Sequence, residues 1–226
     1  RELYEAFFKG YTEKQWGLAA SEIPGSILNR LPLRFNYDGS YFNHPVQAIP
    51  KYGYTPIIEN ILDHPNIRVD LDTAFNRSDA TEYDHLFYSG QIDRYFQFSE
   101  GYLPYRTLDF EVIRITGDFQ GCPVMNYCDD TVPWTRITEH KHFAPWEKSD
   151  QSICYKEYSR ACEEGDIPYY PVKLASENKM LQRYQKLTMN EQGVSFVGRL
   201  GAFKYMDMDQ AIADALKTAT RFLVSR

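Results

Sequence analysis

The sequence lacks any apolar stretch long enough for a membrane-spanning helix. In its 226 residues no run approaches the roughly 18 consecutive apolar side chains needed to cross a bilayer. No charged and then apolar leader opens the chain, so we expect a cytoplasmic protein without membrane insertion. The chain has only four cysteines. Without a leader, we expect Cys122, Cys128, Cys154 and Cys162 to be reduced and chemically inert.

An excess of positive charge is also missing, as are the familiar phosphate-loop and metal motifs. The chain has 25 Lys and Arg against 31 Asp and Glu, a net charge of −6. We therefore expect no nucleic-acid partner, because phosphate backbones require a basic face. No GxGxxG or GxxxxGK[ST] motif occurs, so this chain cannot supply a dinucleotide fingerprint. No CxxC pair occurs either, and we expect no metal site.

Aromatic residues, by contrast, are abundant. The chain has 18 Tyr, 14 Phe and 3 Trp. Residues 7–17 (FFKGYTEKQWG) are the densest example, because helical spacing places Phe7, Tyr11 and Trp16 along one wall. Two interpretations stay open for this wall, packing in a core and stacking on a base or sugar ring.

Hydrophobic periodicity predicts an α+β fold in three parts. Residues 1–66 are predicted to be helical and loop-rich, with a helix that Thr55 caps and Pro56 begins. From about 67 to 159 the period is two and no helical pattern separates the apolar runs, which predicts a central antiparallel sheet domain over residues 67–174. The expected strands are 67–71, 85–88, 105–116, 123–127, 135–143 and 154–159.

The last part, residues 175–226, is predicted to be helix–strand–helix. Helical spacing covers 177–192, a short strand covers 194–197, and Met208 to Leu223 form an amphipathic helix. The connection 198–209 leaves two interpretations open. Free backbone N–H groups at the start of the helix could bind an anion, or the Asp residues could simply cap that helix.

Residues 135–143 carry the clearest candidate for ligand binding. On a strand, Arg136, Thr138, His140 and His142 point to one face. Arg136 suits a phosphate that is held by two parallel hydrogen bonds, and a polar face toward solvent is the alternative. Spacing places no third ligand beside the two histidines, so they predict no metal.

Seven segments together resemble the UDP-galactopyranose mutase family, nearer its bacterial branch. They are FFKGYTEKQWG (7–17), RLPLRFNYDGSYF (30–42), PKYGYT (50–55), YSGQIDRYF (88–96), YRTLDFE (105–111), TRITEHKHF (135–143) and GRLGAFKYMDM (198–208). The resemblance runs essentially end to end, but the family's N-terminal segment with its FAD fingerprint is not present. We therefore interpret the chain as a fragment, whose residues 175–226 would complete an FAD-binding domain.

The resemblance implies an isomerase that interconverts UDP-galactopyranose and UDP-galactofuranose through a reduced-flavin N5–sugar adduct. It further implies FAD as cofactor, a homodimer, and a role in cell-surface polysaccharide biosynthesis, in lipopolysaccharide or cell wall. Because the flavin fingerprint is absent, we expect this chain alone to be inactive. A non-catalytic module that binds UDP-sugars is the alternative, and a purely structural domain is a third interpretation.

The resemblance also implies roles for individual residues. Arg30, on a mobile loop, and Arg136 would be the two diphosphate arginines, which we expect to be catalytic. Tyr11 with Phe7 would stack on uracil, and Trp16 would lie beside the sugar–diphosphate. The remaining substrate-binding positions that it implies are Tyr41, Asn126, Tyr170, Tyr205 and Asp207. The positions that it implies for the flavin are Arg199 and Met208.

Overall fold

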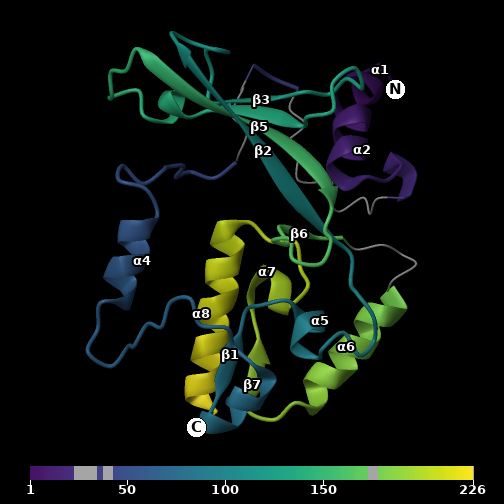
Figure 1. The fold of residues 1–226 in the computed structure, drawn as a ribbon, viewed down its shortest axis with the longest axis vertical. Helices are drawn as coiled ribbons and strands as arrows, with labels where there is room; N and C mark the ends of the chain where they lie inside the picture. Colours follow the sequence, from purple (N-terminus) through teal and green to yellow (C-terminus); the bar gives the residue numbers. More distant parts are fainter. Residues whose placement is uncertain (23–34, 38–42, 173–177, 226) are drawn as a thin grey trace.

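A computed structural model describes residues 1–22, 35–37, 43–172 and 178–225 of the chain. It confirms the predicted α+β class, because helices lie beside and below a five-stranded antiparallel sheet with the strand order β3–β4–β5–β2–β6 (Figure 1). The strands are β2 (Tyr105–Thr116), β3 (Val124–Asn126), β4 (Arg136–Glu139), β5 (Gln151–Ala161) and β6 (Tyr170–Pro171).

The two long strands, β2 and β5, form the backbone of this sheet. They pair from Arg106 opposite Ala161 to Thr116 opposite Gln151. β2 is rich in β-branched and aromatic residues, which favour a pleated, half-buried surface. On the other side of β5, β4 places Arg136 opposite Glu157, and β3 places Asn126 opposite Arg136. Directly paired residues share a face of a sheet, so these three side chains form one row.

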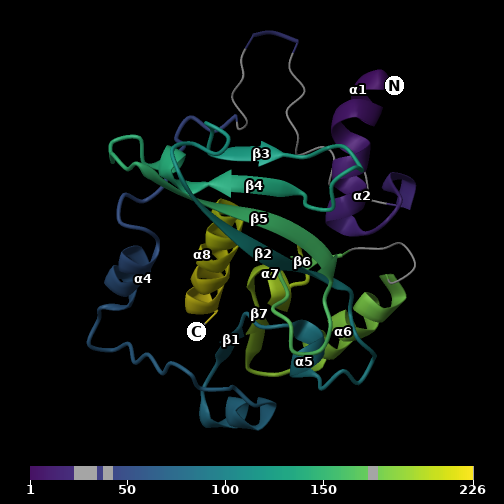
Figure 2. The same ribbon diagram turned by 45° about the horizontal axis from the view of Figure 1, so that its top comes forward.

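The N-terminal residues form one helical stretch that lies against the sheet. It consists of α1 (Glu2–Tyr4), the π-helical segment η1 (Glu5–Lys9) and α2 (Gly10–Trp16). The stretch ends at Gly17, whose φ of 67° is left-handed and suits glycine. Figure 2 shows α2 beside the ends of β3 and β4. A short 3-10 turn, η2 (Ala20–Glu22), follows.

A second, two-stranded sheet lies apart from the first. Its strands β1 (Leu86–Tyr88) and β7 (Val194–Phe196) run parallel. The helices around it are α5 (Ile92–Tyr95), α6 (Asn178–Asn190), α7 (Gly198–Gly201) and α8 (Met208–Val224). The buried cluster in this region consists of Ile92, Tyr95, Phe96, Leu103, Tyr105, Leu181, Tyr184 and Phe203.

Three predictions about local structure were wrong. The strand 85–88 exists, but it pairs in parallel with β7 and not within the antiparallel sheet. β7 is far away along the chain, so no local pattern indicates this pairing. Residues 67–71 form no strand and are exposed, because no neighbouring strand pairs with them. β4 ends at Glu139, and η4 (His140–Phe143) is a 3-10 helix, so His140 and His142 do not extend the strand face of Arg136.

Two predicted amphipathic helices exist, but their apolar residues are exposed. In α8, Ile212, Leu216 and Leu223 are 55%, 65% and 72% exposed. α4 (Thr55–Leu62) has Tyr54 rather than Thr55 at its N-cap, and it contains no buried residue. A further 3-10 helix, η3 (Arg77–Glu82), precedes β1. Within the described residues, no helix is both long and apolar enough to span a bilayer. The predicted domain boundaries and the completed FAD-binding domain stay predictions.

Candidate functional site

Arg136 on β4 is the centre of the candidate site. Its side chain is 30% exposed, and its Nε lies 3.2 Å from Oε1 of Glu157. Its Nη2 donates a hydrogen bond of 2.8 Å to the Tyr11 hydroxyl on α2. The Nε–H is buried and is not aimed well enough at Glu157 to form a hydrogen bond. A guanidinium carries five N–H donors in a planar fork, so Arg136 keeps donors with which to bind an anion.

Glu157 on β5 is the buried counter-charge of Arg136. Its side chain is 9% exposed, and Thr135 donates a hydrogen bond of 3.3 Å from Oγ1 to its carboxylate. Burial raises the pKa of Glu157, and the charge of Arg136 opposes that shift. Sequence reasoning missed this residue. The alternation along β5 gives no signal, because Ser152 and Cys154 are buried at even positions and Glu157 at an odd one.

A buried arginine from β2 anchors the end of α2. Arg106 donates from Nε to the Gln15 carbonyl (3.2 Å) and from Nη2 to the Lys14 carbonyl (3.4 Å). The Ser159 hydroxyl donates to the same Gln15 carbonyl at 2.7 Å. A Cβ at Gly17 would lie 2.5 Å from Nη1 of Arg106, so the tight turn after α2 depends on glycine. Arg106 therefore fixes the part of the chain that carries Trp16.

Three of the aromatic residues that the resemblance singles out do come together. The ring centroids of Trp16 and Tyr205 are 5.6 Å apart, and those of Trp16 and Tyr170 are 6.2 Å apart. Tyr170 and Tyr205 stack with centroids 5.6 Å apart. Burial raises the pKa of Tyr170 to about 12, and Glu157 acts in the same direction while Arg136 opposes it. Tyr170 therefore stays a neutral hydroxyl donor at neutral pH and lies close to the charged pair.

The two residues implied for the flavin have different surroundings. Arg199 donates from Nε to the Met206 carbonyl (3.0 Å) and from Nη1 to the Tyr169 carbonyl (3.0 Å). Its guanidinium also lies over the rings of the stacked tyrosine pair, at 5.3 and 5.2 Å from their centroids. Met208, at the start of α8, is 57% exposed. Arg199 is thus used in holding its own region together, whereas Met208 is accessible.

The remaining predicted positions are more scattered. Phe7 is 60% exposed, whereas Trp16 is 6% exposed and belongs to a buried cluster with Val172, which is the core-packing interpretation for that residue. Asn126 is exposed on β3, in register with Arg136. Asp207 forms a capping box with Gln210 at the start of α8, which is the capping interpretation of 198–209. Arg30 and Tyr41, with the loop expected around Arg30, lie outside the described residues.

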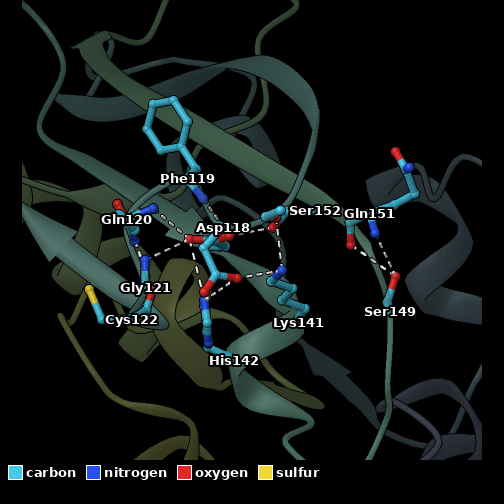
Figure 3. A network of polar contacts seen from close by, with 12 residues as sticks. Asp118, Phe119, Gln120, Gly121, Cys122, Lys141, His142, Ser149, Gln151 and Ser152 are labelled. Atoms are coloured by element: carbon cyan, nitrogen blue, oxygen red, sulfur yellow. Dashed lines mark hydrogen bonds and ion pairs between the residues drawn. The ribbon is translucent and has the colours of Figure 1, made fainter.

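A second polar cluster lies around Glu139, at the end of β4. Asp118, Glu139 and His142 bring ligand atoms within 4.8 Å of one another. Figure 3 shows Lys141 and His142 pointing toward Asp118, and Lys141 forms an ion pair with it. Because this ammonium already neutralises Asp118, the cluster has little need of a cation.

The Glu139 carboxylate is saturated by donors from the protein. It accepts hydrogen bonds from the backbone N–H groups of residues 119, 120 and 121, at 2.9, 2.8 and 3.1 Å, and from the Ser152 hydroxyl. Burial alone would raise the pKa of Glu139, but these donors lower that pKa to about 2. A carboxylate offers about four lone-pair positions, and four donors use them. We therefore assign this cluster to holding the turn at 118–121 and not to a metal.

The Arg136 site has the chemistry of an anion site beside a ring-binding wall. A half-buried guanidinium, backed by a carboxylate and bordered by tyrosine hydroxyls, suits a phosphate or diphosphate. Tyr170 of β6 and Tyr205 before α8 add partly exposed rings, which pack on the buried Trp16. Such an arrangement can bind a ligand that combines negative charge with a ring.

Comparisons with known proteins agree with this chemistry. The family model described as UDP-galactopyranose mutase matches residues 6–205. The chain is 57% identical over 225 residues to a protein of Klebsiella pneumoniae named "Probable UDP-galactopyranose mutase", covering all of this chain and 59% of that protein. It is 48% identical to a dTDP-fucopyranose mutase of Escherichia coli, covering 98% of this chain and 61% of that protein.

A more distant relative and a solved structure extend the comparison. A UDP-galactopyranose mutase of Mycoplasma pneumoniae is 34% identical over 94% of this chain and 57% of its own length. The crystal structure of a reduced UDP-galactopyranose mutase superposes with a TM-score of 0.73 at 13% identity, covering 99% of this chain and 64% of that one. At that identity the likeness shows the fold alone. The chain spans about three fifths of the length of these curated relatives.

Proposed function

The chain belongs to the UDP-galactopyranose mutase family, and from this premise we propose that it is the substrate-binding part of an isomerase that interconverts UDP-galactopyranose and UDP-galactofuranose. The observation that carries the proposal is the Arg136 site. Its guanidinium, 3.2 Å from Glu157 and 2.8 Å from the Tyr11 hydroxyl, suits the diphosphate of a nucleotide sugar.

In this proposal each part of the site contacts a different part of the ligand. Arg136 holds the diphosphate, and the neutral hydroxyl of Tyr170 adds a hydrogen bond to it. Tyr11 lies beside the uracil, and Trp16 and Tyr205 lie beside the sugar–diphosphate. Arg136 would then stabilise the negative charge that UDP carries when its bond to the sugar breaks. The substrate contacts of Phe7, Arg30, Tyr41, Asn126 and Asp207 stay predictions.

We propose FAD as the cofactor of the complete enzyme. Met208 is exposed and free to contact a flavin, whereas Arg199 would support the site by packing on Tyr170 and Tyr205. When bound in its reduced form, the flavin would supply the nucleophile for the anomeric carbon of galactose. The residues of this chain would bind UDP, orient the sugar and screen the charge of the diphosphate.

Three finer properties belong to the same proposal. We propose a homodimer in the cytoplasm whose product serves cell-surface polysaccharide biosynthesis. Two relatives differ in nucleotide and sugar, since one is named for UDP-galactopyranose and one for dTDP-fucopyranose. Both substrates are pyrimidine nucleoside diphosphate sugars, and we favour the former because that relative is the more similar of the two.

The test compares this chain with the whole reading frame that contains it. Each protein is incubated with UDP-galactofuranose and reduced FAD, and UDP-galactopyranose is measured by chromatography. dTDP-fucofuranose serves as the competing substrate. We expect conversion of the UDP-sugar by the whole reading frame and UDP binding without conversion by the 226-residue chain. UDP binding by both proteins without conversion by either would instead support a non-catalytic binding module.

A further inference from the structure

Lys14 on α2 donates to three backbone carbonyls at once. Its Nζ lies 2.7 Å from the Asp129 carbonyl, 3.1 Å from that of Val132 and 3.0 Å from that of Trp134. These carbonyls belong to the segment that connects β3 to β4. An ammonium group has three N–H donors and no acceptor, so this carbonyl cage uses its full hydrogen-bonding capacity.

The carbonyl cage joins the two chain segments that meet at the candidate site. Lys14 lies on the same helix as Tyr11, three residues further along, and i,i+3 residues are neighbours on a helix surface. The last carbonyl of the cage belongs to Trp134, two residues before Arg136. Tyr11 and Arg136 are joined by the 2.8 Å hydrogen bond from Nη2 to the hydroxyl.

The helix and this segment also meet without any intervening side chain. A Cβ added at Gly10 would lie 2.1 Å from the Cys128 carbonyl oxygen, so the helix backbone packs directly on the segment. Burial lowers the pKa of Lys14, and the nearby charge of Asp129 opposes that shift. A close backbone approach and a three-fold hydrogen-bonded ammonium therefore fix the same contact from two adjacent points.

We propose that Lys14 is a positioning residue, which sets the Tyr11 hydroxyl relative to the Arg136 guanidinium and thereby controls affinity for a nucleoside diphosphate. Without the ammonium, the half-buried carbonyls of Val132 and Trp134 and the exposed carbonyl of Asp129 lose this donor, and α2 can move away from the segment. The identity of the ligand rests on the proposed function, whereas the role of the carbonyl cage in joining the two segments does not.

The first test measures UDP binding by calorimetry with the 226-residue chain. Lys14→Met keeps the length of the side chain and removes its charge and donors. Lys9→Met, on the preceding exposed turn, is the matched control. We expect Lys14→Met to weaken UDP binding about tenfold or more, and Lys9→Met to change it less than about twofold. Unchanged affinity in Lys14→Met would overturn the proposal.

A double-mutant cycle separates positioning from simple stabilisation. Tyr11→Phe removes the hydroxyl that accepts a hydrogen bond from Arg136. Its effect on UDP affinity is measured in two backgrounds, the unsubstituted chain and Lys14→Met. If Lys14 positions Tyr11, the loss caused by Tyr11→Phe shrinks toward nothing in the Lys14→Met background. If the fold-losses in UDP affinity of the two single variants multiply in the double variant, Lys14 acts on stability alone and the proposal is overturned.

Hydrogen exchange makes the result independent of the ligand. In Lys14→Met we expect faster amide exchange both in residues 10–16 and in residues 127–135, with no change in Lys9→Met. Unchanged exchange in these two segments would contradict the carbonyl cage itself. If no variant binds UDP, the unsubstituted chain included, the proposed function fails for this chain. Hydrogen exchange then decides alone whether Lys14 joins α2 to the segment.

Discussion

Two regions of the molecule differ in the kind of contact that holds them together. Around α2, β4 and β5, charged and polar side chains are paired over long distances along the chain, as in Arg136 with Glu157 and Arg106 with Gln15. Around β1 and β7, a two-stranded parallel sheet lies beside α8, a helix of 17 residues with no buried residue. The first region is held mainly by polar pairs, although the Nε of Arg136 has no hydrogen bond. The second region has a buried cluster around Tyr184 and Phe203, but its helix α8 presents apolar side chains to the surroundings.

Ligand binding and the exposed apolar face of α8 therefore belong to different regions of the molecule. The candidate site draws its geometry from contacts within the first region, so substitutions there should change ligand affinity. The amphipathic pattern of α8 is typical of a helix whose apolar face packs against another element. While that face is exposed, its side chains contribute little to the stability of this chain. Four substitutions test whether the two regions differ in this way.

Arg136→Ala should have the largest effect. It removes the cation of the candidate site and leaves Glu157 buried without its partner. We expect UDP affinity to fall by about a hundredfold or more, measured by calorimetry. Arg160→Ala is the matched control, because Arg160 lies on the neighbouring strand and pairs with Asp109 and Asp166 near the surface. Equal losses in both variants would mean that Arg136 has no special role in binding.

Gly10→Ala should have the next largest effect, and its sign is informative. Helix propensity alone predicts a gain of about 1 kcal/mol when alanine replaces glycine within a helix. The new Cβ would lie 2.1 Å from the Cys128 carbonyl oxygen, so α2 must shift. We expect a net loss of about 1–3 kcal/mol in the free energy of unfolding. Denaturant unfolding measures it, and a net gain in stability would show that α2 does not pack closely on this segment.

The pH dependence of stability should show a graded effect from Glu139. Its folded-state pKa of about 2 is depressed from the ordinary value of 4.5, so its contribution is complete above that ordinary value. The contribution is lost as the pH falls through the folded pKa. We expect stability to decline between about pH 5 and pH 2, and Glu139→Gln to flatten this part of the profile. Parallel profiles for the two proteins would contradict the network of backbone donors.

Leu216→Ala should have the smallest effect. Leu216 is 65% exposed on α8, whereas Ile137 on β4 is 1% exposed. We expect a change within about 0.5 kcal/mol for Leu216→Ala and a loss of about 2–5 kcal/mol for Ile137→Ala. Thermal or denaturant unfolding compares the two. A large loss at Leu216 would show that α8 is covered in solution, and the contrast between the regions would disappear.

Sequence patterns predicted the elements whose signals are local. The strand 105–116 was predicted with the bounds of β2, and the helix from Met208 was predicted from its apolar period. The parallel pairing of β1 with β7 was missed, because it joins segments far apart in the chain. The alternation at 67–71 was misleading, since period two indicates a strand only where another strand pairs with it.

The candidate site was predictable only in part, for the same reason. Arg136 followed from residue chemistry on a predicted strand. The wall expected from helical spacing stays a prediction, because Phe7 is exposed and Trp16 is buried. Glu157, Arg106 and Lys14 were missed, because their partners are fixed by strand register and by backbone carbonyls that no side-chain pattern reveals. Tyr170 and Tyr205 came only from the family resemblance.

A calorimetric comparison of UDP with uridine on the 226-residue chain shows directly whether Arg136 binds a diphosphate. The two ligands share the base and ribose and differ in the diphosphate that we assign to Arg136. We predict that UDP binds at least about a hundredfold more tightly than uridine, and that Arg136→Ala removes the difference. Equal affinities for UDP and uridine in the unsubstituted chain would contradict the assignment of a diphosphate site to Arg136.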